Sequence, residues 1–416
     1  MIRADLLLEG IGDLATLAGP PPPRVGRSAG DLGRIDGAGL AIDGGRFVCV
    51  GRERAVRREV RLRSSGRSID LAGAAVVPGF VDAHTHLLFG GDRSAEVGAK
   101  VRGASYVEIA RRGGGIYATV RATRRATTSA LADAARGRLR RMLASGTTTA
   151  EVKSGYALTH AGELRLLGLI PGLARTSGVR LVPTYLGAHA VPPGRERSSY
   201  VEEIVGRTLP EVARRRLARF CDVFCEPGFF PVPDGARVLR AAQRLGLGAK
   251  VHADEFRRSG GGALAARLGA VSAEHLLETP DADRARLARA GVTAVLLPVT
   301  PFSSLASSRS PGREMVDAGV AVALGSDLSP NSWIEAMPIV LAHAVYSARL
   351  TPAEAIVAAT VNAAHAIGVA DRAGSIAVGR EADLAVFDLP SVERIPYRIG
   401  SLPTRVYRRG IRVSPA

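Results

Sequence analysis

Cysteine and long apolar runs are scarce in this 416-residue chain. The three cysteines, Cys49, Cys221 and Cys225, are too few for a disulfide framework and favour a reducing, cytoplasmic compartment. No apolar run approaches the roughly 20 residues needed to span a bilayer, which argues against a membrane protein. Residues 1–5 include an acidic side chain and lack a typical signal-peptide pattern. These absences together predict a cytoplasmic globular protein with no membrane association.

Lysine is scarce as well, although the chain is strongly basic. Of its 56 basic residues, 53 are arginines, and the lysines stand only at positions 100, 153 and 250. The net charge of +17 would suit nucleic acid, but the arginines are spread over alanine-rich, helix-like segments without interleaved aromatic residues. We therefore expect no nucleic-acid partner. A need for a compact ammonium group would explain why Lys153 and Lys250 are not arginines.

Short apolar runs alternate with longer amphipathic segments over the middle of the chain, which predicts an α/β fold. The expected helices include 129–144, 161–177, 235–245 and 261–268. The apolar runs provide eight strand candidates separated by helices. This pattern favours a TIM-like (β/α)8 barrel over the alternative, a doubly wound sheet. The eight strand candidates are residues 75–83, 147–152, 180–186, 222–225, 249–252, 271–274, 293–297 and 320–324.

The two ends of the chain have a different character. A hairpin-like segment surrounds Asp43-Gly44-Gly45, and apolar strand-like segments cover 382–387 and 404–413. Neither end alone offers a sizeable core. We therefore expect residues 1–74 and 377–416 to pair as one small β-sandwich domain, beside a barrel of residues 75–376 that the helices of 351–368 complete.

Two histidines one residue apart end the first apolar run, Val76-Val77-Pro78-Gly79-Phe80-Val81-Asp82-Ala83-His84-Thr85-His86. Alternate side chains of a strand share a face, so His84 and His86 are expected to point the same way. Two neutral imidazoles side by side suit zinc or iron. The alternative is a pair of solvated or hydrogen-bonded histidines.

Polar residues gather at the predicted carboxyl ends of other strands, where barrel enzymes carry their catalytic groups. His252 and Asp327 stand at two such ends and would complete a set of three histidines and one aspartate. Such a set leaves a position open for water, which is typical of catalytic metal sites. The alternatives are an interior barrel histidine at 252 and a helix N-cap at Asp327.

Further residues near these ends suggest acid–base and binding roles. Glu255 could shuttle a proton to a leaving nitrogen, unless it forms a surface salt bridge. His275 could polarise a carbonyl, unless it is simply buried. Arg93 follows Gly90-Gly91-Asp92 and could clamp a substrate carboxylate. Tyr106, Tyr156 and His189 could add polar contacts.

Several segments together resemble the amidohydrolase superfamily and, within it, the imidazolonepropionase family. The resemblance covers nearly the whole chain, and its most specific parts are Gly90-Gly91-Asp92-Arg93 and Lys153-Ser154-Gly155-Tyr156. The other matching segments are Pro78 to His86, Gly146 to Val152, Leu186 to Pro192, His252-Ala253-Asp254-Glu255 and Val361-Asn362-Ala363-Ala364.

The resemblance implies a cyclic-amide hydrolase of histidine degradation, which converts 4-imidazolone-5-propanoate into N-formimino-L-glutamate. It implies one zinc or iron ion per subunit and a homodimer. It also implies roles for individual residues: metal ligands His84, His86, His252 and Asp327; substrate contacts Arg93, Tyr106, Tyr156, His189 and Glu255; catalytic groups Glu255, His275 and Asp327.

Two segments depart from what relatives carry. Many two-metal amidohydrolases have a carboxylated lysine on the fourth strand, whereas residues 222–230 contain no lysine, which favours one metal unless Glu226 acts as a bridge. After Asp327, the family's Asp-Phe-Asn-Pro-Gly-Ser is replaced by Asp327-Leu328-Ser329-Pro330-Asn331-Ser332. Ser329, Asn331 and Ser332 are expected to contact the substrate or product. We hypothesise that the Asn331 amide replaces the family's missing asparagine; ordinary turn chemistry is the alternative.

Two other functions compete with this prediction. A metal-dependent aminohydrolase that deaminates a purine, pyrimidine or related ring would share the His-x-His and His-x-x-Glu patterns. A metal-free binding or assembly protein could use the same barrel, but that class would be expected to have lost its ligands. Arg93, Tyr156 and His189 favour an anionic substrate, which the family resemblance implies is a small cyclic amide.

Overall fold

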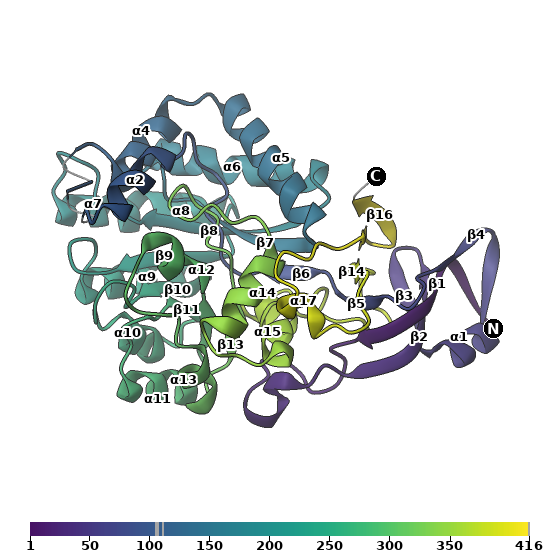
Figure 1. The fold of residues 1–416 in the computed structure, drawn as a ribbon. Helices are drawn as coiled ribbons and strands as arrows, with labels where there is room; N and C mark the ends of the chain where they lie inside the picture. The colour runs from purple at the N-terminus through teal and green to yellow at the C-terminus, as the bar shows by residue number, and fades with distance from the viewer. Residues whose placement is uncertain (105–107, 110–111, 415–416) are drawn as a thin grey trace.

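Two eight-stranded sheets organise the chain in the computed structural model, which describes residues 1–104, 108–109 and 112–414. One sheet is parallel and forms the barrel. The other collects segments from both ends of the chain, which lie side by side at one edge of the molecule (Figure 1).

The barrel strands follow one another in chain order from β6 to β13, and every neighbouring pair is parallel. Backbone hydrogen bonds from Ala83 to Leu324 and from His86 to Leu328 connect the first and last strands. The predicted (β/α)8 fold is confirmed. The strands are β6 (Phe80–Asp82), β7 (Thr147–Lys153), β8 (Arg180–Ala188), β9 (Phe220–Cys225), β10 (Gly248–Ala253), β11 (Ser272–His275), β12 (Thr293–Leu296) and β13 (Val322–Leu324).

The prediction of a single first barrel strand over residues 75–83 is wrong. Residues Ala75–Pro78 form β5, which pairs with β1 and β14 of the other sheet, and only Phe80–Asp82 belong to the barrel. The chain changes sheets at Gly79, where an added Cβ would lie 2.3 Å from the Thr148 hydroxyl. A run buried on all sides gives the sequence no sign of this change.

The second sheet has the order β16-β15-β14-β5-β1-β2-β3. The remaining strand, β4, pairs with residues 2–9 of β1. The two chain ends pair as predicted, but they form one hydrogen-bonded sheet and not the expected sandwich of two, around a core that includes Leu8, Phe47 and Tyr407. The division into domains at residues 75 and 376 stays a prediction. By that division β5 belongs to the barrel, although its strand neighbours belong to the small sheet. Its strands besides β5 are β1 (Ile2–Ala15), β2 (Arg34–Asp43), β3 (Arg46–Arg52), β4 (Val60–Asp70), β14 (Leu384–Phe387), β15 (Arg405–Arg408) and β16 (Ile411–Ser414).

Helices cover the outside of the barrel, with α9 next to β9 and β10, and α10 next to β10 and β11 (Figure 1). Their apolar faces pack on the strands, as in α9, where Val238, Leu239 and Ala242 are buried. None of the helices in the described parts of the chain is long and apolar enough to cross a bilayer. The α-helices are α1 (Glu53–Glu59), α2 (Val97–Val101), α4 (Gly115–Arg125), α5 (Thr128–Ala144), α6 (His160–Thr176), α7 (Arg197–Glu203), α8 (Leu209–Arg214), α9 (Val232–Arg244), α10 (Gly261–Leu268), α11 (Asp281–Ala290), α12 (Val299–Ser304), α13 (Gly312–Asp317), α14 (Met337–Tyr346), α15 (Pro352–Ala358), α16 (Val361–Ala366) and α17 (Arg394–Tyr397).

A buried amide ties the N-terminal segment to the barrel. The Asn362 side chain on α16 accepts a hydrogen bond from the Arg24 backbone N–H at 2.7 Å. It donates to the carbonyls of Arg24 at 3.0 Å and of Val322 at 2.9 Å. The fully buried Arg24 guanidinium in turn donates to the Leu17 carbonyl at 2.6 Å. One asparagine therefore satisfies three backbone groups that water does not reach.

Asn362→Ala is expected to lower the free energy of unfolding by about 2–4 kcal/mol, because it leaves these buried groups without partners. Urea unfolding followed by circular dichroism measures the loss. Gln243→Ala is the control, since its amide bonds one carbonyl at the surface and its loss should cost less than about 0.5 kcal/mol. A stability equal to wild type in Asn362→Ala would contradict this interpretation.

Candidate metal and substrate site

Three imidazoles and one carboxylate converge at the carboxyl end of β10 and just beyond the ends of β6 and β13. The Nε2 atom of His86 lies 3.2 Å from Nε2 of His84 and 3.4 Å from Nε2 of His252. The Asp327 Oδ1 atom is 3.5 Å from the Nε2 atoms of both His84 and His86. All four side chains are buried, so four predicted ligand atoms share one protected spot.

These separations fit a metal ion. Metal–nitrogen bonds of about 2.0–2.1 Å in a tetrahedral site place neighbouring donor atoms roughly 3.3 Å apart. The lone pairs of imidazoles so close together would repel one another without a proton or a cation between them. Burial and the neighbouring His189 lower the pKa of His86 well below its ordinary value, which favours the neutral, metal-binding form. The donor set therefore suits zinc or iron, the metals that combine imidazole and carboxylate ligands.

The backbone around these ligands is fixed by a second carboxylate. Asp82 accepts hydrogen bonds from the Ser326 N–H at 2.9 Å and the Ser326 hydroxyl at 2.6 Å, and from the His84 N–H at 3.3 Å. It thereby joins the end of β6 to the end of β13. Asp327 follows with a left-handed φ of 53°, and Thr300 donates to its Oδ2 at 2.9 Å. The strained backbone of Asp327 is thus held from two sides.

The far ring nitrogens of two histidines face carboxylates. His84 Nδ1 lies 2.6 Å from Glu274 Oε2, and His252 Nδ1 lies 2.8 Å from Asp222 Oδ2. Burial lowers and the Glu274 carboxylate raises the pKa of His84, with a net rise to about 9. A carboxylate on Nδ1 keeps the proton there and turns Nε2 toward the shared spot. The sequence prediction missed both Glu274 and Asp222.

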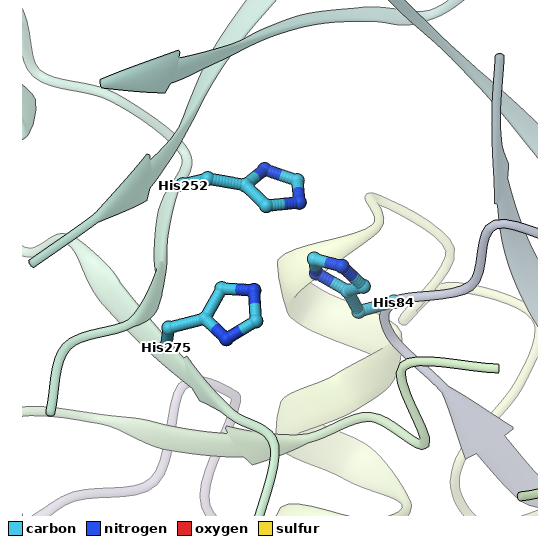
Figure 2. Close-up of side chains that lie close together, drawn as sticks. All are labelled: His84, His252 and His275. Carbon is cyan, nitrogen blue, oxygen red and sulfur yellow. The ribbon is translucent and has the colours of Figure 1, made fainter. Parts of the chain in front are cut away.

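His275 lies beside the same histidines. Its ring centroid is 5.4 Å from that of His84 and 5.2 Å from that of His252, and the three rings face one another (Figure 2). His84, His252 and His275 also form a group whose ligand atoms lie close enough to hold a metal. Burial lowers the pKa of His275 well below its ordinary value, so a neutral ring stands at the edge of the site.

Glu255 occupies the other side of His275, with 3.7 Å between Glu255 Oε1 and His275 Nδ1. Burial, together with the carboxylates of Asp327 and Glu226, raises the pKa of Glu255 well above its usual value. Glu226 accepts a hydrogen bond from the Glu255 N–H at 2.5 Å. Glu226 therefore anchors Glu255, and it is absent from the groups of described residues that could hold a metal.

One cavity brings most of the predicted site residues together. His84 and Ser332 are exceptions, because both are fully buried and neither lines the cavity; the Ser332 N–H donates to the Ser329 hydroxyl at 3.2 Å. Tyr106 lies outside the described residues. The predicted residues that line the cavity are His86, Arg93, Tyr156, His189, His252, Glu255, His275, Asp327, Ser329 and Asn331.

Apolar side chains form part of the same cavity, namely Ile116, Phe224, Phe229 and Phe256. The sequence did not indicate these residues, because an apolar side chain that lines a cavity has the same sequence pattern as one in the core. Phe224 and Phe229 pack with ring centroids 4.5 Å apart. The cavity thus offers aromatic surface for a flat ring opposite the charged groups.

Arg93 and Asn331 both have partners within the protein. The Arg93 Nε and Nη2 atoms donate to Glu96 Oε2 at 2.9 and 2.7 Å. The Asn331 amide accepts from Lys100 Nζ at 2.7 Å and donates to the Ser304 hydroxyl at 3.2 Å. Glu96 and Lys100 therefore fix the orientation of two polar groups that line the cavity.

The loop that carries Tyr156 is held by a buried carboxylate. Glu163 accepts hydrogen bonds from the N–H groups of Gly155 at 2.7 Å, Ala157 at 2.9 Å and Leu158 at 2.8 Å. His189 Nδ1 donates to the Gly155 carbonyl at 3.0 Å, since a carbonyl only accepts. This bond directs the proton-free Nε2 of a neutral His189 away from the loop. Burial lowers the pKa of His189 to about 3, so the ring is neutral near pH 7.

Sequence comparisons find known enzymes that are similar to this chain. The model of the amidohydrolase family matches residues 236–409. An imidazolonepropionase of Symbiobacterium thermophilum is 47% identical over 99% of this chain and 97% of its own length. One of Geobacillus kaustophilus is 43% identical over 93% of this chain and 92% of its own length.

Comparisons of structure agree on the fold. A zinc-bound adenosine deaminase of Xanthomonas campestris superposes with a TM-score of 0.73 at 21% identity, covering 99% of this chain and 93% of its own. A zinc complex of an atrazine chlorohydrolase variant of Arthrobacter aurescens superposes with a TM-score of 0.70 at 17% identity, covering 98% and 94%. Identities this low establish the shared fold and say nothing of the substrate.

Glu163→Gln is expected to loosen the loop of residues 154–158. Glutamine keeps one acceptor oxygen and turns an N–H₂ donor toward backbone N–H groups, which cannot accept. Amide hydrogen exchange in this loop should become about 10-fold faster or more, as expected for the loss of one charge-assisted bond. Glu211→Gln, on the surface of α8, is the matched control and should leave this loop unchanged. Wild-type exchange rates in Glu163→Gln would contradict the assignment.

Proposed function

Because the chain belongs to the imidazolonepropionase family of the amidohydrolases, we propose specific roles for its residues in hydrolysis of 4-imidazolone-5-propanoate. The chain is a hydrolase of cyclic-amide C–N bonds, and its reaction yields N-formimino-L-glutamate in histidine degradation. The assignment of the reacting centre rests on the convergence of His84 Nε2, His252 Nε2 and Asp327 Oδ1, each of which lies within 3.5 Å of His86 Nε2.

His84, His86, His252 and Asp327 would hold one zinc or iron ion per subunit. When bound, the metal supplies a water molecule of lowered pKa. Asp327 is preferred to His275 as the fourth ligand because its Oδ1 is equidistant from His84 and His86 Nε2. The Asp327 carboxylate, whose Oδ2 Thr300 holds at 2.9 Å, would also orient that water.

The carboxylate of the substrate would bind Arg93, whose guanidinium lies in the cavity and is oriented by Glu96. Tyr156 and His189 would contact the polar edge of the imidazolone ring, and Phe224 would stack on its face. Tyr106 is proposed as a further contact from the resemblance alone. In the departing loop, Ser329 and Asn331 line the cavity and would contact the product, while Ser332 would act by holding Ser329.

Glu255 and His275 would carry the proton transfers. Glu255 accepts a proton from the attacking water and delivers it to the ring nitrogen that leaves as the C–N bond breaks. A raised pKa suits this role, because the same carboxyl must gain and release a proton near neutral pH. The neutral His275 ring donates a hydrogen bond to the carbonyl oxygen as negative charge develops there.

We also propose that the enzyme acts in the cytoplasm as a homodimer. Cys49, Cys221 and Cys225 are all free thiols, which fits a reducing compartment. The dimer rests on the family resemblance.

Deamination of a nitrogen ring is the second candidate. The fold is shared with a zinc-bound adenosine deaminase, so the barrel and its histidines do not separate the two reactions. The cationic Arg93 in the cavity favours the substrate that carries a carboxylate. A metal-free binding protein is disfavoured by the complete set of four converging ligand atoms.

Purified protein loaded with zinc or iron is expected to consume imidazolone propanoate. The reaction is measured as the loss of the substrate's ultraviolet absorption. Removing the metal with a chelator should lower the rate by roughly 100-fold or more, because water near neutral pH is then a poor nucleophile. Adding metal back should restore it. A panel of purines and pyrimidines is the control. Turnover of the panel without turnover of the imidazolone would establish the deaminase instead.

Arg93→Lys is expected to raise the KM of the imidazolone about 10–100-fold, because one charge-assisted hydrogen bond to the carboxylate is lost. The kcat should change less, since the carboxylate is remote from the bond that breaks. Steady-state kinetics measure both constants. Arg289→Lys, on the exposed surface of α11, controls for the exchange of arginine for lysine. An unchanged KM in Arg93→Lys would remove Arg93 from the substrate site.

A further inference from the structure

Five charged side chains fill the inside of the barrel below the histidines. Two are the lysines Lys153 and Lys250, and three are carboxylates. All five are fully buried, and they come from the strands β7, β9, β10 and β11. The three carboxylates are Glu151, Asp222 and Glu274.

Lys153 stands at the centre of this cluster. Its Nζ atom lies 2.8 Å from Glu151 Oε2, 2.8 Å from Glu274 Oε2 and 2.9 Å from Asp222 Oδ2. Glu274 Oε2 is the oxygen that faces His84 Nδ1 at 2.6 Å. Asp222 Oδ2 is the oxygen that faces His252 Nδ1 at 2.8 Å. One ammonium group therefore connects, through one carboxylate each, to two of the proposed metal ligands.

Lys250 contacts two of the same carboxylates from their other side. Its Nζ atom lies 3.0 Å from both Glu151 Oε1 and Glu274 Oε1. Ser272 also donates to Glu274 Oε1, at 3.0 Å, and Thr184 donates to Glu151 Oε1, at 2.5 Å. Neither Oε1 atom is the oxygen that faces a histidine at 2.6 or 2.8 Å. The two lysines thus share depth and charge but differ in which oxygens they hold.

The place of Lys153 is one that a cation would otherwise occupy. Two groups of described residues besides the site itself could hold a metal ion: His84 with Glu151 and Glu274, and His252 with Asp222 and Glu274. Lys153 Nζ is within 2.9 Å of the carboxylates of both groups. A compact ammonium with three donors can meet three carboxylates in three directions, which a planar guanidinium cannot. This accounts for a lysine here in a chain with 53 arginines among its 56 basic residues.

We propose that Lys153 is a positioning residue, a built-in cation that fixes Glu274 and Asp222 so that His84 and His252 present Nε2 to the metal. The proposal rests on the metal site of the proposed function. The Lys153 side chain acts on the proposed ligands through the two carboxylates, whereas its backbone N–H, which donates to the Thr85 carbonyl at 2.9 Å, is unaffected by side-chain substitution. Lys250 contributes charge balance but does not orient the histidines.

A pair of double variants separates orientation from charge balance. Lys153→Met with Glu151→Gln, and Lys250→Met with Glu151→Gln, each remove one positive and one negative charge from the same cluster. Only the first removes the contact to Glu274 Oε2 and Asp222 Oδ2. Zinc affinity is measured by competition with a chromogenic chelator, and the folding of the metal-free proteins by circular dichroism and thermal unfolding.

Zinc affinity is expected to fall about 10–100-fold in the Lys153 double variant, the loss typical of groups that orient metal-binding histidines. It should change less than about threefold in the Lys250 double variant. Equal losses in the two variants, or none in either, would overturn the proposal. Absence of zinc binding by wild type would instead overturn the proposed metal site.

Lys153→Arg provides a second route if the double variants do not fold. It keeps the positive charge and replaces the three-directional ammonium by a planar group. We expect a loss of zinc affinity of about 10-fold or more for the folded protein. Arg289→Lys, an exchange between the same two residue types on the exposed surface of α11, is the control and should bind zinc as wild type does. Wild-type zinc affinity in Lys153→Arg would overturn the proposal.

Discussion

Compensation of charge inside the barrel is the constraint on which the site depends. Taking a carboxylate out of water is costly unless a cation and hydrogen-bond donors meet it, and here three carboxylates are fully buried. Lys153 and Lys250 meet all three within 3.0 Å. Because the strands supply these groups from a rigid, hydrogen-bonded sheet, the carboxylates stay where two histidines need them. The reactive end of the barrel is therefore supported from below.

Above this cluster, the site is built from residues at and just past the strand ends, where the backbone leaves its regular path. Asp327 and His275 both have left-handed φ values, of 53° and 68°. Such conformations persist only where neighbouring groups hold them. The Asp82 carboxylate, which joins the ends of β6 and β13, is one such group. Regular strands give rigidity, and these irregular positions aim the side chains into the cavity.

Features that obey local rules could be predicted from the sequence, whereas features that depend on packing between distant segments could not. Alternation of strands and helices indicated the barrel, and the spacing of His84 and His86 indicated half of the converging ligand atoms. The change of sheet at Gly79 was missed, because a buried run looks the same in either sheet. Glu274 and Asp222 were missed since a carboxylate inside a strand has no motif. The one sequence feature that could have indicated these buried carboxylates was the use of lysine, and not arginine, at positions 153 and 250.

The residues that line the cavity show the same limit of prediction from sequence. Its polar residues could be found by asking which ones end a strand, but Phe224, Phe229 and Phe256 carry no such mark. Ser332 was placed in the site by its neighbours in sequence, whereas the turn buries it behind Ser329. Turn geometry decides which of several nearby polar positions faces a ligand, and periodicity does not report it.

The passage from β5 to β6 has a consequence for protein engineering. β5 lies between β1 and β14, so both of its hydrogen-bonding edges are supplied by segments outside the barrel. Only five residues separate the end of β5 at Pro78 from His84. A barrel without the two flanks would begin with a strand that has no hydrogen-bonded neighbour on either side, directly upstream of His84 and His86. The barrel is therefore not an independent domain, and an engineered version of it must keep the small sheet.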